Sequence, residues 1–306
     1  MTFSVHGRTV GTAVTLLVLA TSTNADVSSL TDLVDKPDVF TPGAPPKSPE
    51  VVLDDHVRAG RYWRIDAPRG PLHVWIPANY DAETAATVVF VHGYWTEVDD
   101  AWMDYRLPQQ FALSGINAMF IAAGGPSAKW ESLVWPSLSE LLKTVDENVD
   151  VPMPTKRLVA VGHSGAYRTL AVWLGNQALD TVVLLDAFYA EYSFMPWVKE
   201  SKERRLVNIV YETARWAEYM HRRLPTTKRV DGLPLVGFPE SRILYVKTDV
   251  GHWELVSDGV AMPLALRAIG VPPVLGAPLS LPLGLPLRCD PVVQNPFAPR
   301  IADLER

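Results

Sequence analysis

The chain has 306 residues, of which 48% are hydrophobic and 20% are charged, and its formal net charge is −6. This length and hydrophobic content favour a folded protein with one sizeable core and argue against a mostly disordered chain. The negative charge and the lack of any run of Lys or Arg disfavour nucleic-acid binding, because that binding depends on cations that neutralise phosphates. We therefore expect a globular protein without a nucleic-acid partner.

The first 25 residues have the pattern of an export signal. Arg8 precedes an apolar run over 10–20, and Ala25 stands directly before Asp26. A basic start, a short apolar run and a small final residue are typical of a Sec-type signal peptide, and the run is shorter than the roughly 20 apolar residues that span a bilayer. We predict a signal peptide over 1–25 and a periplasmic or secreted protein with no stable membrane span after cleavage. An uncleaved N-terminal anchor is the alternative.

Two proline-containing stretches flank the rest of the chain. Residues 26–50 are polar and contain Pro, whereas residues 271–306 are rich in Pro, Leu and Gly. Proline disrupts helix interiors and central strands, so we predict a linker for the first stretch and a tail without regular core structure for the second. The single cysteine, Cys289, lies in that tail, where we expect neither a disulfide nor a catalytic role.

Between these ends, short apolar strands alternate with amphipathic helices. Residues 61–67 and 72–76 have the pattern of a hairpin, and the later strands are apolar on both faces, as buried parallel strands are. The alternation predicts an α/β fold in one domain over 51–270, with a mostly parallel, eight-stranded mixed sheet and helices on both faces. The other predicted strands are 87–91, 116–123, 157–161, 181–185, 206–211 and 243–247, and the predicted helices are 133–149, 166–174, 214–223 and 261–269.

A candidate nucleophile lies where a predicted strand meets a predicted helix. The segment Gly162-His163-Ser164-Gly165-Ala166 places a serine between small residues two positions before it and two after it. Small residues allow a sharp turn that exposes the serine hydroxyl, and the start of the next helix adds a positive dipole end for a developing oxyanion. A tight turn whose serine only caps the helix is the alternative.

This segment resembles the nucleophile elbow, Gly-x-Ser-x-Gly, of the α/β-hydrolase superfamily, with Ala166 in place of the last glycine. A second similarity is His92-Gly93, which follows a predicted buried strand at the place where the family has its oxyanion loop. The resemblance implies a serine hydrolase with an α/β-hydrolase fold. It also implies that the backbone amides of Tyr94 and Gly165 form the oxyanion hole. No subfamily is identified.

One of the seven histidines is the candidate general base. His252 lies in the loop after the last predicted strand, and the superfamily order is serine, then acid, then histidine. A neutral imidazole at that edge can accept the serine proton and return it to the leaving group. The other six lie in the signal peptide, before the first strand, on the hairpin, in the oxyanion loop, in the elbow and inside a helix (His6, His56, His73, His92, His163 and His221).

Two carboxylates are candidates for the acid that orients this histidine. Asp186 ends the strand after the elbow helix, and Glu212 ends the next strand, where the superfamily more often has its acid. Asp186 is preferred because it follows a cleaner apolar run and opens an aromatic loop, and Glu212 stays open as the alternative. For either residue, a helix cap or a solvated loop carboxylate is the purely structural explanation.

Imidazole and aromatic side chains near the predicted site are candidates for a substrate pocket. His92, His163, Trp95 and Trp253 are the residues selected, and the tryptophans suit an apolar acyl group or a sugar ring. Residues 188–199 are a candidate lid. The acidic residues that follow Trp95 lack the spacing of a calcium loop and fit an acidic helix start, so we expect no metal and no cofactor.

The resemblance covers about residues 60–265 and implies an exported serine hydrolase that cleaves an ester or amide bond through a Ser-His-acid triad and an acyl-enzyme. Its substrate would be a small molecule, a peptide or a cell-wall component. A catalytically degenerate binding protein or envelope scaffold is the alternative, because a fold does not establish a function. The sequence leaves the bond type and the oligomeric state open.

Overall fold

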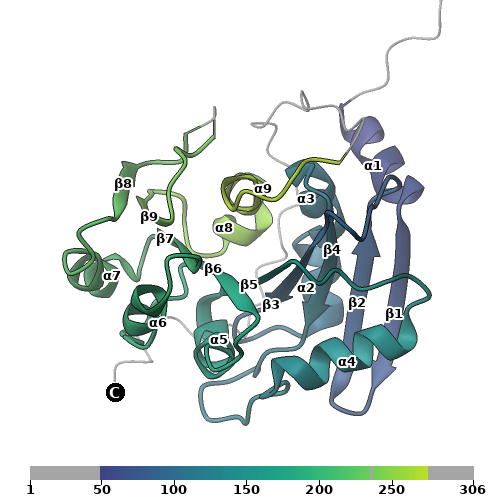
Figure 1. Ribbon diagram of the computed structural model, residues 1–306, viewed down its shortest axis with the longest axis horizontal. Coiled ribbons are helices and arrows are strands. Elements are labelled where there is room, and N and C mark those ends of the chain that lie inside the picture. The colour runs from purple at the N-terminus through teal and green to yellow at the C-terminus, as the bar shows by residue number, and fades with distance from the viewer. Residues whose placement is uncertain (1–48, 235–236, 275–306) are drawn as a thin grey trace, which may run out of the picture. The chain divides into compact units, whose positions relative to one another are not determined.

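The computed structural model describes residues 49–234 and 237–274 (Figure 1). The predicted signal peptide, nearly all of the predicted linker, Cys289 and most of the Pro-rich tail lie outside these residues. By its contacts the chain divides into two units, Met1–Pro46 and Lys47–Arg306, and every residue described belongs to the second. Within the described ranges, no helix has the length and apolar character needed to cross a membrane.

A nine-stranded mixed sheet organises this unit, in the order β1-β2-β4-β3-β5-β6-β7-β9-β8. β1 and β2 form an antiparallel hairpin, β2 is also antiparallel to β4, and all other neighbours are parallel. The mostly parallel sheet predicted from the sequence is confirmed. The strands are β1 Arg61–Ala67, β2 Gly70–Ile76, β3 Ala86–Val91, β4 Ala118–Ala123, β5 Arg157–His163, β6 Leu179–Leu185, β7 Arg205–Val210, β8 Lys228–Asp231 and β9 Ile243–Lys247.

The sheet has one strand more than the eight predicted. The additional strand, β8, has the sequence Lys-Arg-Val-Asp, is largely exposed, and pairs in parallel with β9 at the edge of the sheet. Charged residues suit an edge strand because they discourage pairing with other chains. The same charged residues remove the apolar pattern by which a strand is recognised in a sequence.

Helices cover both faces of the sheet (Figure 1). The core on one face includes residues of α4, α5, α6 and α7, and the core on the other includes residues of α2, α3, α8 and α9. This two-layer burial explains why the central strands are apolar on both faces. The helices are α1 Pro49–Ala59, α2 Val98–Asp104, α3 Leu107–Ser114, α4 Leu138–Asn148, α5 Tyr167–Trp173, α6 Phe194–Glu200, α7 Ala214–His221, α8 Glu254–Ser257 and α9 Ala261–Ala268.

Two segments differ from their predicted roles. The helix predicted from residue 133 begins at Leu138, because the Ser137 side chain caps it by accepting a hydrogen bond from the Glu140 backbone N–H at 3.2 Å. The candidate lid over 188–199 instead contributes to the core, where Phe188 and Phe194 are fully buried. Phe188, Phe194 and Trp197 are therefore part of the core, whereas Tyr189 is only partly buried and Tyr192 is exposed.

The beginning of the predicted Pro-rich tail is attached to the unit. Pro273 forms an isolated antiparallel bridge with Ile116, in which the Asn117 N–H donates to the Pro272 carbonyl at 2.7 Å and the Val274 N–H donates to the Gly115 carbonyl at 2.8 Å. Proline can occupy such a bridge because neighbouring residues supply the N–H groups.

We predict that Phe120→Ala strongly destabilises the fold. Phe120 is fully buried in β4, and its ring stacks on that of Phe111 with centroids 4.3 Å apart. Removing such a ring leaves a cavity, so the free energy of unfolding should fall by about 3–5 kcal/mol in urea denaturation. Val172→Ala is the matched control, because Val172 is 54% exposed and its loss should change stability by no more than about 0.5 kcal/mol.

Candidate active site

Ser164 occupies a sharp, left-handed turn between β5 and α5. Its φ of 51° is unfavourable for a residue with a side chain, and such strain is concentrated at functional sites. A Cβ added to Gly162 would lie 2.8 Å from the Leu170 side chain and 3.1 Å from the Ala166 Cβ. Glycine at 162 therefore lets the helix close onto the strand and also leaves room for the alanine that departs from the family pattern.

The loop after β3 packs directly on this turn. A Cβ added to Gly93 would lie 2.7 Å from the Ser164 Cβ, and one added to Gly165 would lie 2.4 Å from the Tyr94 ring. Neither position has space for a side chain. The two residues whose amides the sequence assigns to an oxyanion hole, Tyr94 and Gly165, thus lie side by side next to the serine.

His92 supports this loop from beneath. Its ring is fully buried, with Nδ1 2.7 Å from the Gly93 carbonyl oxygen and Nε2 accepting a hydrogen bond from the Gly125 N–H at 3.0 Å. Because Nε2 accepts a hydrogen bond, the proton of the neutral His92 ring is on Nδ1, which donates to the Gly93 carbonyl oxygen. Both ring nitrogens are therefore used to hold two loops together, and the assignment of His92 to the lining of a pocket is not supported by its position.

Asp186 forms the most heavily hydrogen-bonded group of the site. It follows β6, is fully buried, and accepts hydrogen bonds from the backbone N–H groups of Tyr211, Glu212 and Thr213 at 2.9–3.1 Å and from the Thr213 hydroxyl at 2.7 Å. Burial alone raises the pKa of Asp186, but hydrogen bonds from His252 and Thr213 outweigh it and hold that pKa well below its usual range. The carboxylate is therefore ionised at neutral pH.

His252 is paired with Asp186. Its Nδ1 lies 2.7 Å from Asp186 Oδ2, which leaves Nε2 as the unprotonated nitrogen of a neutral ring. The other candidate acid, Glu212, contributes its backbone N–H to Asp186, and its own side chain is exposed. Among the residues with described positions, Asp186 is the carboxylate that is hydrogen-bonded to His252.

These groups form a cluster of possible metal ligands, but both oxygens of the buried Asp186 already accept hydrogen bonds. The distances between the possible ligand atoms are at most 4.8 Å, with one such atom each from Asp186, Glu212 and His252. A cation bound there would have to displace the hydrogen bond between His252 and Asp186 and those that the backbone donates to the same carboxylate. The donor set is thus arranged to orient an imidazole.

His163 lies behind His252 as a buried, neutral partner. Its Nε2 is 2.9 Å from the His252 carbonyl oxygen, and the two ring centroids are 4.6 Å apart. Burial, together with the positive charge that His252 can carry, lowers the pKa of His163 to about 3. Because the ring is fully buried, it holds the loop that carries His252 rather than lining a pocket.

Two residues of the site were missed in the sequence. Tyr189 is packed between the rings of Tyr167 and Trp216, and a hydrogen bond with Ser164 partly offsets the rise in its pKa that burial causes. Thr213 gives Asp186 two hydrogen bonds. The feature of the sequence that points to both residues is their position shortly after the ends of β6 and β7, because the loops that follow parallel strands gather at the same edge of the sheet.

The tryptophans divide into exposed and buried sets. Trp95, Trp130 and Trp253 are 46%, 77% and 43% exposed, and the Trp253 centroid lies 5.5 Å from those of both His163 and His252. Trp135 and Trp197 instead belong to the core. The structure therefore brings Trp253 beside the paired histidine and leaves Trp95 open to solvent in the loop after β3.

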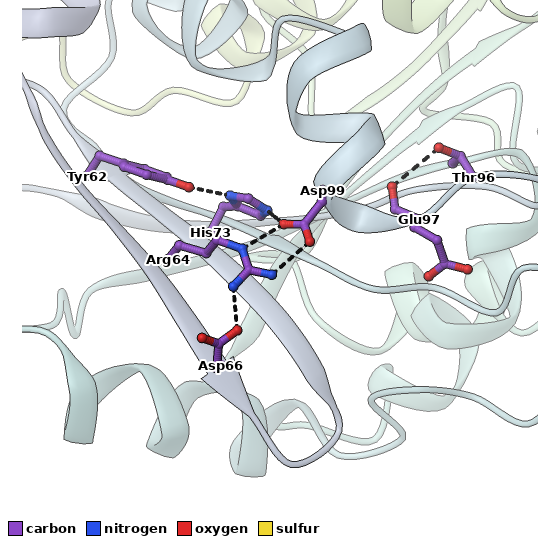
Figure 2. Close-up of polar contacts among 7 residues, drawn as sticks. All are labelled: Tyr62, Arg64, Asp66, His73, Thr96, Glu97 and Asp99. Carbon is purple, nitrogen blue, oxygen red and sulfur yellow. Dashed lines mark hydrogen bonds and ion pairs between the residues drawn. The ribbon is translucent and has the colours of Figure 1, made fainter.

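A polar cluster fixes α2, the helix that follows this loop, to the hairpin (Figure 2). Asp99 in its first turn lies 2.8 Å from His73 Nε2 and accepts two hydrogen bonds from Arg64 at 2.8 and 2.9 Å. The Tyr62 hydroxyl lies 2.8 Å from His73 Nδ1, and the His73 ring stacks on Trp102. The acidic helix start expected from the sequence is thus an anchoring point and not only a solvated surface.

Comparisons with known proteins give only distant structural similarity. No protein-family model and no curated protein matches the chain. A feruloyl esterase module from Clostridium thermocellum is 11% identical, with 69% of this chain and 87% of that chain covered and a TM-score of 0.48. An S-formylglutathione hydrolase from Staphylococcus aureus is 15% identical, with 69% and 98% covered and a TM-score of 0.44.

An esterase from Pyrococcus furiosus is 15% identical, with 70% of this chain and 90% of that chain covered and a TM-score of 0.39. Similarity at this level of identity and TM-score carries no information about the chemistry of the site.

We predict that His163 makes stability depend on pH. Its pKa of about 3 in the fold lies below the ordinary value of about 6.5, so its contribution is fully present above pH 6.5 and is lost as the pH falls toward 3. The loss should be about 1.4 kcal/mol per pH unit between about pH 6 and 4. His163→Gln, which keeps a donor for the His252 carbonyl but does not titrate, should show a shallower slope in urea denaturation. Equal slopes would contradict the prediction.

Proposed function

We propose that this chain is a serine hydrolase that cleaves a carboxylic ester or amide through an acyl-enzyme. The observation that carries the proposal is the buried Asp186–His252 pair, whose nitrogen and oxygen are 2.7 Å apart, at the same edge of the sheet as the strained serine turn. A buried carboxylate that orients an imidazole near a serine on a left-handed turn is the arrangement that activates a serine hydroxyl.

In the first half of the reaction, Ser164 Oγ attacks the substrate carbonyl and its proton passes to His252 Nε2. We assign stabilisation of the charge that develops on the carbonyl oxygen to the backbone N–H groups of Tyr94 and Gly165, because the Tyr94 ring packs against Gly165 beside the serine. Asp186 stabilises the imidazolium because its own pKa is held low. His252 then gives the proton to the leaving group, and the acyl group stays on the serine.

In the second half, a water molecule replaces the leaving group. His252 takes a proton from the water as it attacks the acyl carbon, and returning that proton to Ser164 restores the free enzyme. The neutral state of His163 suits this cycle, because a second positive charge 4.6 Å from the His252 ring would oppose protonation of the base.

We also infer export to the periplasm or the medium. The basis is the sequence of the first 25 residues, with Arg8 before a short apolar run and Ala25 at its end. Mass spectrometry of the mature protein from culture supernatant and periplasm would test this by locating its N-terminus.

The first prediction of this proposal concerns Ser164→Ala. The variant should lose at least about 10³-fold in kcat on a small ester, because no other group supplies the nucleophile, and should keep its fold. A fluorophosphonate probe should label the unmodified protein stoichiometrically and should not label the variant. Turnover that survives in Ser164→Ala, or folded protein that resists the probe, would contradict the assignment.

The second prediction separates the two candidate acids. Asp186→Asn should lower kcat by about 10³–10⁴-fold, because the imidazole loses the acceptor that sets its tautomer and stabilises its charge. Glu212→Gln is the matched control and should stay within about threefold of the unmodified protein, since its exposed side chain is not the one paired with His252. The reverse order of losses would assign the acid to Glu212. Circular dichroism of both variants would show whether the fold is intact.

A further inference from the structure

Two exposed tryptophans beside the proposed site are paired with each other. Trp95 lies in the loop between β3 and α2, and Trp130 lies in the segment between β4 and α4. Their ring centroids are 6.5 Å apart and their planes meet at 75°, while 46% and 77% of their surfaces are exposed. An edge-to-face contact leaves indole faces uncovered, and neighbouring exposed aromatic rings of this size are typical of binding surfaces.

The backbone at Trp95 is strained, although the residue carries a large side chain. Its φ is 69°, in the left-handed region that favours glycine, and its N–H donates to the Ser127 carbonyl at 3.0 Å. Strain of this kind persists where the surrounding structure imposes it and is concentrated at ligand sites. Trp95 is two residues after Gly93, so their Cα atoms are at most about 7 Å apart. Because Gly93 packs against Ser164, the backbone that carries the Trp95 indole lies close to the candidate nucleophile.

Polar contacts also fix the segment that carries Trp130. The Ser127 N–H donates to Glu131 at 2.8 Å, and the Ser127 hydroxyl donates to Glu97 at 2.7 Å. Arg168, on the helix that follows the elbow, donates to the Glu131 carbonyl at 2.9 Å. The backbone that carries the pair is thus held in place before any ligand binds, which reduces the entropic cost of binding.

The charges beside the pair indicate the chemistry of its ligand. Glu97 and Glu131 are exposed, and each uses one carboxylate oxygen in the contacts above. A wholly apolar group placed there would take carboxylates out of water without giving them a partner, which is costly. An anionic group would be repelled by the two carboxylates, and a cationic group would meet the exposed Lys129, which directly precedes Trp130. A neutral ring with C–H faces and hydroxyl donors can instead stack on indole and hydrogen-bond to the carboxylates.

We propose that Trp95 and Trp130 form a subsite that stacks a neutral pyranose ring, which makes sugar esters the substrate class of the site. This rests on the proposed function. In the reaction, the acyl–oxygen bond to the sugar breaks as the bond to Ser164 Oγ forms, and the serine proton reaches the sugar oxygen through His252. Water then takes the acyl group and releases a carboxylic acid, so the products are the free sugar and the acid.

The test compares two esters of the same acid, methyl 6-O-acetyl-glucopyranoside and ethyl acetate, which differ in the presence of the ring. Trp130→Ala should lower the ratio of kcat/KM for the sugar ester to that for ethyl acetate by about tenfold, mainly through KM, as expected for the loss of one aromatic stack. Trp130→Tyr should restore most of the ratio. Trp95→Gly, which suits the left-handed backbone, should lower it similarly. Met103→Ala is the matched control, because Met103 is 70% exposed on α2 and outside the subsite.

A binding measurement separates this proposal from the proposed function. Calorimetry with methyl glucopyranoside on Ser164→Ala should show binding that weakens about tenfold when Trp130→Ala is added, whether or not the protein hydrolyses esters. Sugar binding without ester hydrolysis would overturn the proposed function and keep the subsite. No detectable sugar binding, an unchanged ratio in Trp130→Ala, or an equal fall for both esters would overturn the subsite. A fall confined to an aromatic acyl ester, methyl cinnamate, would overturn it as well.

Discussion

The site depends on one buried carboxylate. Asp186 has no exposed surface, and its charge is tolerated there because both carboxylate oxygens accept hydrogen bonds. The donors come from the segment after β7 and from His252 after β9. The hydrogen bonds of the carboxylate therefore form only where the ends of β6, β7 and β9 come together. The same arrangement sets the position and tautomer of the His252 imidazole.

A second constraint is steric and acts on the neighbouring strand ends. Gly93 and Gly165 have no room for a side chain, because the Ser164 Cβ and the Tyr94 ring occupy that space. The close approach holds the serine in a backbone conformation that it would not adopt in isolation. Packing of the neighbouring loops thus maintains the strained backbone of Ser164, which places its hydroxyl at the edge of the sheet.

Polar residues next to the candidate site hold its loops and helices together. His92 ties two loops together, His163 supports the loop of His252, and Asp99 fixes α2 to the hairpin. Each of these groups holds a neighbouring loop or helix through a hydrogen bond, although the buried Nδ1 of His163 has no partner among the described residues. Trp95, Trp130 and Trp253 remain exposed to solvent together with the carboxylates Glu97, Glu131 and Glu212, so the surface around the site offers both indole faces and acidic groups.

Local signals located the serine, because the elbow is a contiguous segment whose small residues are visible in the sequence. They located the histidine by its place after the last strand. The acid was left open between Asp186 and Glu212, since both end strands at the same edge and only the direction of each side chain separates them. Likewise, no local pattern distinguishes the exposed Trp130 from the buried Trp135 five residues later.

The sequence alone determined the α/β architecture, the hairpin and the strand-to-helix turn, because hydrophobic periodicity and turn residues act over a few neighbouring positions. The tertiary structure decided the partner of His252, the burial of His92 and His163, the pairing of Trp95 with Trp130 and the edge strand β8. Each of these depends on contacts between segments that are far apart in the chain, and the pattern of a single segment does not encode them.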